Sequence, residues 1–440
     1  MVGPLDPSSR LPDAQRRVSP SKKLPTGRIG RMRRLVGVGL RAGADMVRER
    51  SEGAAAQKAA EVLGQMRGVA AKVGQMAGYV DGVVPEGQRE AYERWMKTLL
   101  EQAPSSSPEA VRERVLEQLG MPLDEAFAEF EEQPVASASI GQVHRARLLD
   151  GREVAVKIQH PGVDKAMDAD LDNIKVLEPM FALFAGAQFE SKRIAGEIRD
   201  RFREEIDYEL EARRQLKMAE IHAGDPSIKV PGIVASHSGP RIITMDWVEG
   251  LSFAEAAEAP EDLRRQWAET MWRFVYKGVL VGGHFNADPH PGNYKFHDDG
   301  TVTFLDHGCV QEADARKRAE GSAAHIAACR GDRPAFEQAC REMMKLRGGE
   351  FERASMEYLY EAFAPQLHAP YKIERHYVAG LAKRFKDTFQ EIRKLEDDSY
   401  VAFEPGVFFL NRLQFGFYSV LARLDVEVDY ARVELEFLSP

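Results

Sequence analysis

One segment of the chain reads Phe285-Asn286-Ala287-Asp288-Pro289-His290-Pro291-Gly292-Asn293, and a second segment, Leu305-Asp306-His307-Gly308, follows it. Together they place an aspartate, an asparagine five positions on, and then a second aspartate shortly before a glycine. A carboxylate can hold an attacking nucleophile, and hard oxygen donors hold Mg²⁺ against phosphates. The ordered set Asp288, Asn293 and Asp306 therefore indicates phosphoryl transfer from ATP, or ATP hydrolysis.

The order matches that of a protein kinase: a catalytic-loop Asp, a metal-binding Asn and the metal-binding Asp of a DFG-like turn. Asp-Pro and Pro-Gly-Asn are also ordinary turn signals, so each piece alone is more often a turn than a site. The complete ordered set, together with further motifs upstream, favours a functional site over an ordinary turn.

Composition limits the classes of protein. The chain has 440 residues, 44% of them hydrophobic, which is enough for a sizeable core in two or three domains or in one two-lobed domain. A net charge of −9 argues against general nucleic-acid binding. The three cysteines, Cys309, Cys329 and Cys340, lack a CxxC spacing, so we expect neither a disulfide framework nor a zinc site, and a reducing cytoplasm fits.

No run of eighteen apolar residues occurs, so we expect no transmembrane helix. The richest apolar segment, Val407 to Leu424, is broken by polar residues and is typical of a packed core helix. Residues 31–50 mix arginines with apolar residues. They are consistent with a basic amphipathic helix on an anionic membrane or with a solvated linker helix.

Strand and helix patterns alternate along the middle of the chain. Val143–Leu148 and Val154–Ile158 read as strands around the turn Asp150-Gly151. A helix is expected over 190–223, followed by strands at Val230–Val234 and Arg241–Val248. Most of the chain after residue 261 is expected to be helical, so the pattern predicts an α+β protein with a small mixed lobe before a large helical lobe.

The upstream segment Val154-Ala155-Val156-Lys157 matches the strand lysine of kinases, which reaches the α- and β-phosphates. A kinase lysine needs a glutamate partner on a helix. The acidic segment 204–211 offers several, since Glu205 and Glu209 lie one helical turn apart, as do Asp207 and Glu211. A solvated acidic face is the alternative reading of such a run.

The nucleotide loop of protein kinases is rich in glycine, but this chain has Ala136-Ser137-Ala138-Ser139 before Ile140-Gly141. Small residues still allow the backbone to approach phosphates, with less freedom than glycine. Far upstream stands Lys72-Val73-Gly74-Gln75, in which Lys72 and Gln75 would share a helix face.

These motifs together resemble the UbiB family, the aarF-domain atypical kinases. Lys72–Gln75 resembles its KxGQ signature, Glu205-Ile206-Asp207 its ExD motif, 136–139 its alanine-rich loop and 287–293 its ADPHPGN catalytic loop. The resemblance uses five separate motifs in the expected order and runs from about residue 55 to the C-terminus. It implies a two-lobed protein-kinase-like fold with an N-terminal helical extension packed over the active site.

The resemblance implies four regions: a basic, largely disordered segment 1–50, the extension carrying KxGQ at 51–130, the small lobe at 131–250 and the helical lobe at 251–440. It also implies roles. Lys157 binds ATP phosphates and pairs with Glu211, Asp288 is the catalytic aspartate, and Asn293 and Asp306 hold magnesium. Lys72 and Gln75 belong to the extension, which Glu205 and Asp207 would tie down. The loop that covers the nucleotide consists of Ala136, Ser137, Ala138 and Ser139. The adenine would contact Met245 and Val248.

The chain departs from the family pattern in three places, one of them the loop Ala136-Ser137-Ala138-Ser139, where some members have three alanines. Asn286 stands where the catalytic loop often has His, and His307 stands where a DFG motif has an aromatic residue. An imidazole at position 307 ordinarily titrates near neutral pH. No Ala-Pro-Glu motif follows Asp306, so the activation segment of a peptide kinase is expected to be missing.

The resemblance implies an Mg²⁺-dependent ATP-binding (or ADP-binding) atypical kinase or ATPase that supports isoprenoid quinone biosynthesis or lipid homeostasis. Two alternatives remain open: a small-molecule phosphotransferase of the aminoglycoside or choline type, and a pseudokinase that holds lipid or partner proteins. Protein kinase activity on other proteins is the least favoured. The expected partners are a nucleotide, a peripheral membrane or isoprenoid lipid, and a second copy in a homodimer, with no nucleic acid. The expected location is the cytoplasm, at the inner face of a membrane where the protein is peripheral.

Overall fold

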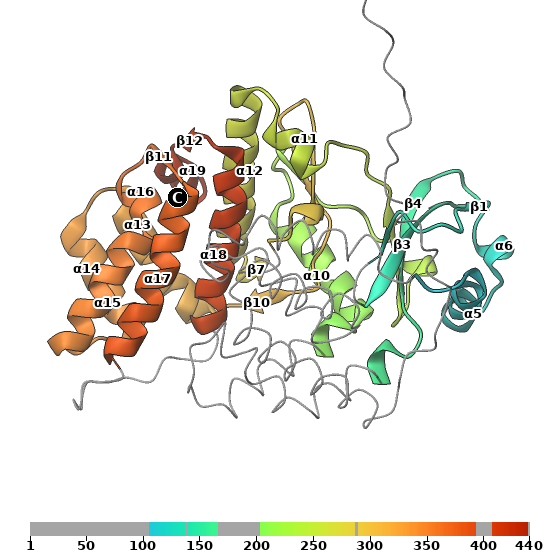
Figure 1. The fold of residues 1–440 in the computed structure, drawn as a ribbon, viewed down its shortest axis with the longest axis horizontal. Helices are drawn as coiled ribbons and strands as arrows, with labels where there is room; N and C mark the ends of the chain where they lie inside the picture. Colours follow the sequence, from blue (N-terminus) through green and yellow to red (C-terminus); the bar gives the residue numbers. More distant parts are fainter. Residues whose placement is uncertain (1–104, 138–139, 166–202, 287–288, 393–406, 439–440) are drawn as a thin grey trace, which may run out of the picture.

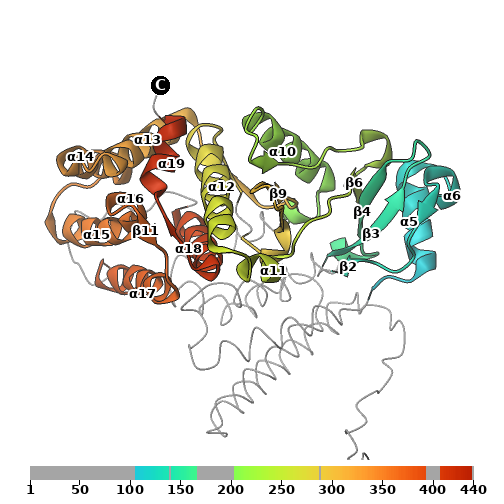
Figure 2. The ribbon, with the colours of Figure 1, turned by 90° about the horizontal axis from the view of Figure 1, so that it is seen from above.

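The computed structural model describes residues 105–137, 140–165, 203–286, 289–392 and 407–438. Within these ranges an antiparallel sheet lies at one end of the molecule and a group of helices at the other, with α10 (Tyr208–Ile221) and several short strands between them (Figure 1, Figure 2). The predicted KxGQ segment, the basic segment 31–50 and the predicted regions 1–50 and most of 51–130 lie outside the described residues.

The sheet has five strands, ordered β1-β3-β4-β6 with β2 paired to β3. Its strands are β1 (Glu129–Phe130), β2 (Ala136–Ser137), β3 (Gly141–Arg147), β4 (Glu153–Gln159) and β6 (Ile242–Asp246). The predicted hairpin is confirmed, because β3 and β4 pair antiparallel and Gly151 has the positive φ of 88° that such a turn demands. Lys157 is paired with Val143 on β3 and with Ile243 on β6, in the middle of the sheet.

Two helices, α5 (Pro108–Leu119) and α6 (Leu123–Ala126), cover one face of this sheet. Ser107 caps α5 by accepting a hydrogen bond from the Ala110 amide, and Gly120 ends it in the left-handed region. Val111 and Val115 of α5 are buried against Val154, Val156 and Ile158, the positions that alternate with Ala155 and Lys157 along β4. This alternation leaves Lys157 on the opposite face, toward α10.

The prediction of one continuous helix over residues 190–223 is wrong at Ile206 and Asp207, where the helix is interrupted. Residues 203–205 are helical, the chain turns at Ile206, and α10 begins anew at Tyr208. Asp207 has an extended backbone and its carboxylate accepts a hydrogen bond from the Leu210 amide at 2.9 Å. An N-cap aspartate begins a helix rather than continuing one, and this competing preference outweighs the helical periodicity of the acidic run.

The strand predicted at Val230–Val234 is also wrong. The strand there is β5 (Ile228–Lys229), and it pairs in parallel with β9 (Val302–Phe304) in a separate three-stranded sheet with β8 (Tyr294–Phe296). The following residues contribute only an isolated bridge between Ile233 and Met245. The strand predicted over Arg241–Val248 is confirmed in its centre as β6.

Short antiparallel strands flank the motif segments. β7 (His284–Asn286) pairs with β10 (Val310–Glu312), and β8 pairs with β9. A single turn, η2 (Pro291–Asn293), leads into β8. These two pairings bring the described ends of the segment 285–293 close to the segment 305–308.

The remainder is mainly helical and surrounds α12 (Glu261–Leu280), whose Trp267, Met271 and Trp272 are fully buried. The predicted core helix Val407–Leu424 is present as α18 with those bounds. No helix in the described ranges is long and apolar enough to cross a membrane. The other elements are η1 (Ala235–His237), α11 (Phe253–Ala257), α13 (Ala315–Cys329), α14 (Arg333–Met344), α15 (Gly349–Ala362), α16 (Ala364–Leu367), β11 (Tyr371–Lys372), α17 (Arg375–Ile392), β12 (Glu427–Val428) and α19 (Tyr430–Leu438).

Candidate functional site

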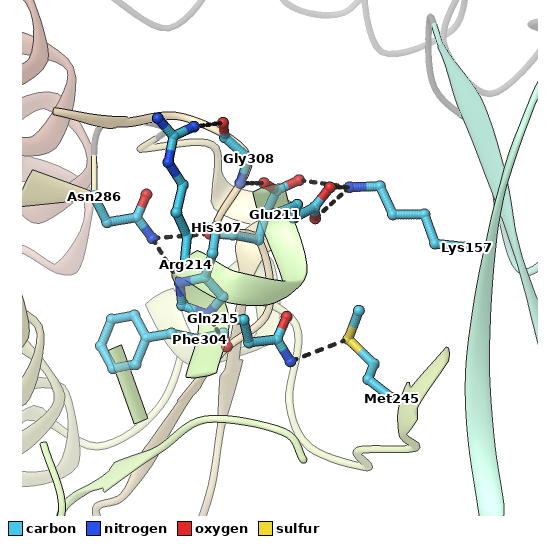
Figure 3. Close-up of polar contacts among 10 residues, drawn as sticks. Lys157, Glu211, Arg214, Gln215, Met245, Asn286, Phe304, His307 and Gly308 are labelled. Carbon is cyan, nitrogen blue, oxygen red and sulfur yellow. Dashed lines mark hydrogen bonds and ion pairs between the residues drawn. The ribbon is translucent and has the colours of Figure 1, made fainter. Parts of the chain in front are cut away.

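An ion pair between Lys157 of β4 and Glu211 of α10 forms the centre of the site (Figure 3). The Lys157 Nζ atom donates to both carboxylate oxygens, at 2.7 and 2.9 Å. Glu211 is 2% exposed, and burial raises its pKa to about 7, with the Asp306 carboxylate adding to the rise. Burial disfavours the charge on Lys157, but the carboxylates of Asp306 and Glu211 more than compensate and raise its pKa, so Lys157 is a cation at neutral pH.

Asp306 joins this pair from the turn after β9. One of its oxygens, Oδ2, lies 3.4 Å from Lys157 Nζ, while Oδ1 accepts a hydrogen bond from the Gly308 amide at 2.9 Å. The backbone of Asn293 is tied to the same turn, since the Leu305 amide donates to the Asn293 carbonyl oxygen at 2.9 Å. The structure therefore brings Lys157, Glu211 and Asp306 together and holds Asn293 one hydrogen bond away. Asp288 lies outside the described residues.

Asn286 and His307, two of the departures from the family pattern, contact each other. The Asn286 side-chain amide donates to the Asp306 carbonyl oxygen at 2.8 Å and lies 3.5 Å from His307 Nδ1 (Figure 3). His307 is fully buried, and its Nε2–H donates to the Phe304 carbonyl oxygen at 3.2 Å. Burial lowers the pKa of His307 to about 4, so the expectation that it titrates near neutral pH is wrong. The Asn286 amide thus holds the backbone of Asp306, and the neutral His307 imidazole lies against that amide and is hydrogen-bonded to Phe304.

Arg214 is a residue of the site that sequence reasoning missed. It lies on α10 three residues after Glu211 and is 6% exposed. Its guanidinium donates to the Gly308 carbonyl oxygen at 3.0 Å and to the Glu204 carboxylate at 2.7 Å. It therefore ties the helix that carries Glu211 to the turn that carries Asp306. The sequence offered one indication that Arg214 belongs to the site: it lies three residues after Glu211, and residues three apart share a helix face.

The ExD residues hold the start of α10. Asp207 is its N-cap, and the backbone of Ile206 is held on the sheet by the Gln159 side-chain amide, which donates to the Ile206 carbonyl oxygen at 2.9 Å. Glu205 is half-buried beside this turn, and its charge adds to the negative potential at Glu211. The predicted contact of Glu205 and Asp207 with Lys72 and Gln75 concerns residues outside the described part of the chain, so it stays a prediction.

Two of the four loop residues, Ala136 and Ser137, lie at the edge of the sheet. Ala136 pairs with Val143 and Ser137 with Gln142, which places β2 beside the start of β3 in the same sheet. Ala138 and Ser139 are outside the described residues. The predicted adenine-contacting residue Met245 is buried on β6, paired with Ala155 on the Lys157 face, and its sulfur lies 3.8 Å from the Gln215 amide (Figure 3). Val248 is half-buried just after β6.

The donor chemistry fits a magnesium ion shared with phosphates. Among the described residues no group of three or more His, Cys, Asp or Glu side chains could hold a metal by itself. Mg²⁺, however, is usually held by one or two protein oxygens together with substrate phosphates and water. Asp306 with Asn293 is such a pair, and the adjacent Lys157 cation suits the phosphates that would complete the coordination.

We expect Arg214→Lys to lower the free energy of unfolding by about 1–3 kcal/mol and to weaken Mg-ADP binding, because a lysine cannot span Gly308 and Glu204 together. The measurement is a urea unfolding curve and an Mg-ADP titration for each variant. Arg213→Lys, one position along and exposed, is the matched control and should leave both quantities unchanged. An Arg214→Lys protein that matches the parent in both would show that the tie between α10 and Gly308 is not needed.

Comparisons with known proteins show which family the chain is similar to. A family model described as the ABC1 atypical kinase-like domain matches residues 98–340. The chain is 33% identical over 264 residues to AarF domain-containing protein kinase 1 of Gallus gallus, a match covering 58% of this chain and 50% of that protein. It is 30% identical over 295 residues to the mitochondrial atypical kinase COQ8 of Saccharomyces cerevisiae, covering 63% of this chain and 58% of that protein.

A solved structure gives a longer match. The complex of Rv3197 with erythromycin from Mycobacterium tuberculosis superposes with a TM-score of 0.59 at 26% sequence identity, covering 86% of this chain and 95% of that one. The matches to the curated relatives span between a third and about three fifths of those proteins' lengths. The predicted fold class, an α+β kinase-like fold, is confirmed by the family match and by this structure.

Proposed function

The chain belongs to the ABC1 atypical kinase-like family, whose model matches more than half of it, and on this premise we propose that it binds Mg-ATP and transfers or hydrolyses the terminal phosphate. The observation that carries the proposal is the three-way contact of Lys157 with Glu211 and Asp306, at 2.7 and 3.4 Å. A lysine held this way presents a fixed cation beside a carboxylate that suits Mg²⁺.

In this proposal Lys157 holds the α- and β-phosphates while Glu211 fixes its position. Asn293 and Asp306 hold Mg²⁺, which would neutralise charge on the transferred phosphate. Asp288 orients the attacking nucleophile. Ala136–Ser139 cover the phosphates, and Met245 and Val248 contact the adenine. Catalysis of this kind rests on position and electrostatics. Asp306 is positioned by the hydrogen bonds that its carbonyl oxygen and its carboxylate accept from Asn286 and Gly308.

The physiological role that we propose is support of isoprenoid quinone biosynthesis or lipid homeostasis, by an enzyme that acts at a membrane surface as a peripheral protein and forms a homodimer. This part rests on the family. The names of two relatives place them in mitochondria and chloroplasts, the yeast COQ8 above and Protein ACTIVITY OF BC1 COMPLEX KINASE 1 of Arabidopsis thaliana. A small-molecule phosphotransferase is the second candidate, because its catalytic loop has similar residues, but ExD would have no role there.

The test is steady-state Mg-ATP hydrolysis by the full chain, with and without anionic liposomes, beside an Asp288→Asn variant. We expect turnover that rises with liposomes and disappears in the variant. Turnover equal in the variant would contradict the role of Asp288. Rapid phosphorylation of soluble alcohols such as choline would favour the second candidate. Intact ATP binding without turnover in any condition would favour a pseudokinase.

A further inference from the structure

The hydroxyl of Tyr208 is a buried polar atom that the site described above does not use. Tyr208 is the first residue of α10 and is 1% exposed. Within the described part of the chain its hydroxyl has no hydrogen-bond partner. A buried hydroxyl without a partner lowers stability, and phenylalanine would fill the same place without that cost. Such an atom in a folded protein calls for a role.

The position of Tyr208 is next to the phosphate-binding groups. Lys157 Nζ lies over its ring, 5.1 Å from the centroid. Its hydroxyl lies against Gly141, where a Cβ atom would come within 2.5 Å of the hydroxyl oxygen and 2.7 Å of the Ile158 carbonyl oxygen. The absence of a side chain at Gly141 therefore makes room for this hydroxyl. Gly141 is the first residue of β3 and follows the loop 136–139 after one intervening residue, Ile140.

Tyr208 cannot move away from this place easily. Gly141 is paired with Gln159, and Val143 with Lys157, so all four residues lie along one face of the β3–β4 hairpin. Gln159 holds the residue two before Tyr208, and Lys157 holds Glu211 three residues after it. The tyrosine is fixed from both sides with its hydroxyl under the start of β3. Burial raises the pKa of the phenol, so it keeps its proton and can donate a hydrogen bond.

We propose that Tyr208 is a nucleotide-binding residue whose hydroxyl donates a hydrogen bond to a phosphate oxygen of the nucleotide that Lys157 holds. The inference rests on the proposed function and deepens it, because it names a phosphate contact that neither the loop nor the metal pair supplies. A phenol that donates to a charged phosphate forms a charge-assisted bond, which is stronger than a bond between neutral groups. The ligand class is a nucleoside di- or triphosphate.

The test compares the full-length parent with Tyr208→Phe, which keeps the ring over Lys157 and removes only the hydroxyl. Mg-ADP, Mg-ATP and adenosine are titrated by calorimetry, and thermal unfolding is recorded without nucleotide. We expect the affinity for both phosphorylated ligands to fall about tenfold. The affinity for adenosine should not change, and the melting temperature of the nucleotide-free protein should stay equal or rise.

Tyr276→Phe is the control, since the buried Tyr276 hydroxyl lies 3.2 Å from the Tyr418 hydroxyl in the helical part of the protein. It should lower the melting temperature without changing nucleotide affinity. Equal Mg-ADP affinity in Tyr208→Phe and the parent would overturn the proposal, and so would a lower melting temperature of the nucleotide-free variant, because the hydroxyl would then serve the fold. A parent that binds no Mg-nucleotide would overturn the proposed function as well, whereas a parent that binds while Tyr208→Phe binds equally overturns this inference alone.

Discussion

Replacing Asp306 with asparagine should weaken Mg-ATP binding roughly 100-fold, a loss of about 2.7 kcal/mol. The reason is that an amide oxygen carries no charge, and Mg²⁺ in proteins depends on one or two carboxylates. Asp306 is one of two carboxylates that the structure places against Lys157, and at 3.4 Å it is the more distant from the lysine. No other change of one functional group should separate metal-dependent from metal-free binding so clearly.

The fold should tolerate this substitution. Asparagine keeps the Oδ1 atom that accepts the Gly308 amide at 2.9 Å, and the backbone carbonyl of residue 306 still accepts from Asn286 at 2.8 Å. Lys157 also retains its two contacts with Glu211. Without metal, the loss of a carboxylate removes a negative charge beside the incoming phosphates, so ATP affinity in EDTA should stay equal or rise.

The measurement is an ATP titration of parent and variant, once with excess Mg²⁺ and once with EDTA. Asp299→Asn is the matched control, since Asp299 also lies in a turn next to β9 and accepts bonds from its neighbour Thr301, but it is exposed. The control should bind like the parent in both conditions. If Asp306→Asn binds Mg-ATP as tightly as the parent, Asp306 is not the metal ligand.

The part of the site that follows from sequence is the part carried by short motifs. Lys157 and Glu211 lie 54 positions apart, yet a strand lysine and a helix glutamate were expected to meet, and they do at 2.7 Å. The hairpin around Gly151 and the helix Val407–Leu424 were predictable for a similar reason, because local turn chemistry and apolar content determine them.

The features that could not be predicted from the sequence depend on contacts between distant segments of the chain. In the sequence, Arg214 is one charged residue among many on its helix. Only the structure shows that its guanidinium lies 3.0 Å from the Gly308 carbonyl oxygen. Asp207 fits helical spacing equally well as a mid-helix residue and as a cap, and only the turn at Ile206 decides between them. The sequence suggests that Gly141 is an ordinary loop glycine, but the structure shows that a side chain there would collide with the Tyr208 hydroxyl. Periodicity contains no information on such pairs.

Glu434 is a second residue that sequence gave no reason to select. It lies on α19 and is fully buried, and its carboxylate accepts bonds from three helices. Trp272 Nε1 and Gln366 Nε2 donate to Oε1 at 2.9 and 3.0 Å, while His325 Nδ1 lies 2.7 Å from Oε2. The Cys329 thiol also donates to Oε2 at 3.4 Å, and burial with the nearby carboxylate raises its pKa, so it remains a thiol.

Glu434→Leu should therefore lower the free energy of unfolding by about 3–5 kcal/mol, because it leaves these buried donors without their acceptor while they stay in place. Glu434→Gln should cost less, because one carbonyl oxygen remains to accept. Urea unfolding of the full chain gives both values from the midpoint and the slope. Nucleotide affinity of the folded variants should match the parent, since Glu434 contacts none of the residues proposed to bind it.

Glu436→Leu serves as the control on the same helix. Its carboxylate is 38% exposed and pairs with Arg273 and Arg432, so its loss should cost at most about 1 kcal/mol. The difference in unfolding free energy between the two variants measures the effect of burial, because both substitutions remove one carboxylate from α19. A Glu434→Leu protein as stable as the Glu436→Leu protein would mean that Trp272, His325 and Gln366 find other acceptors. The junction of α12, α13, α16 and α19 would then be held by apolar packing alone.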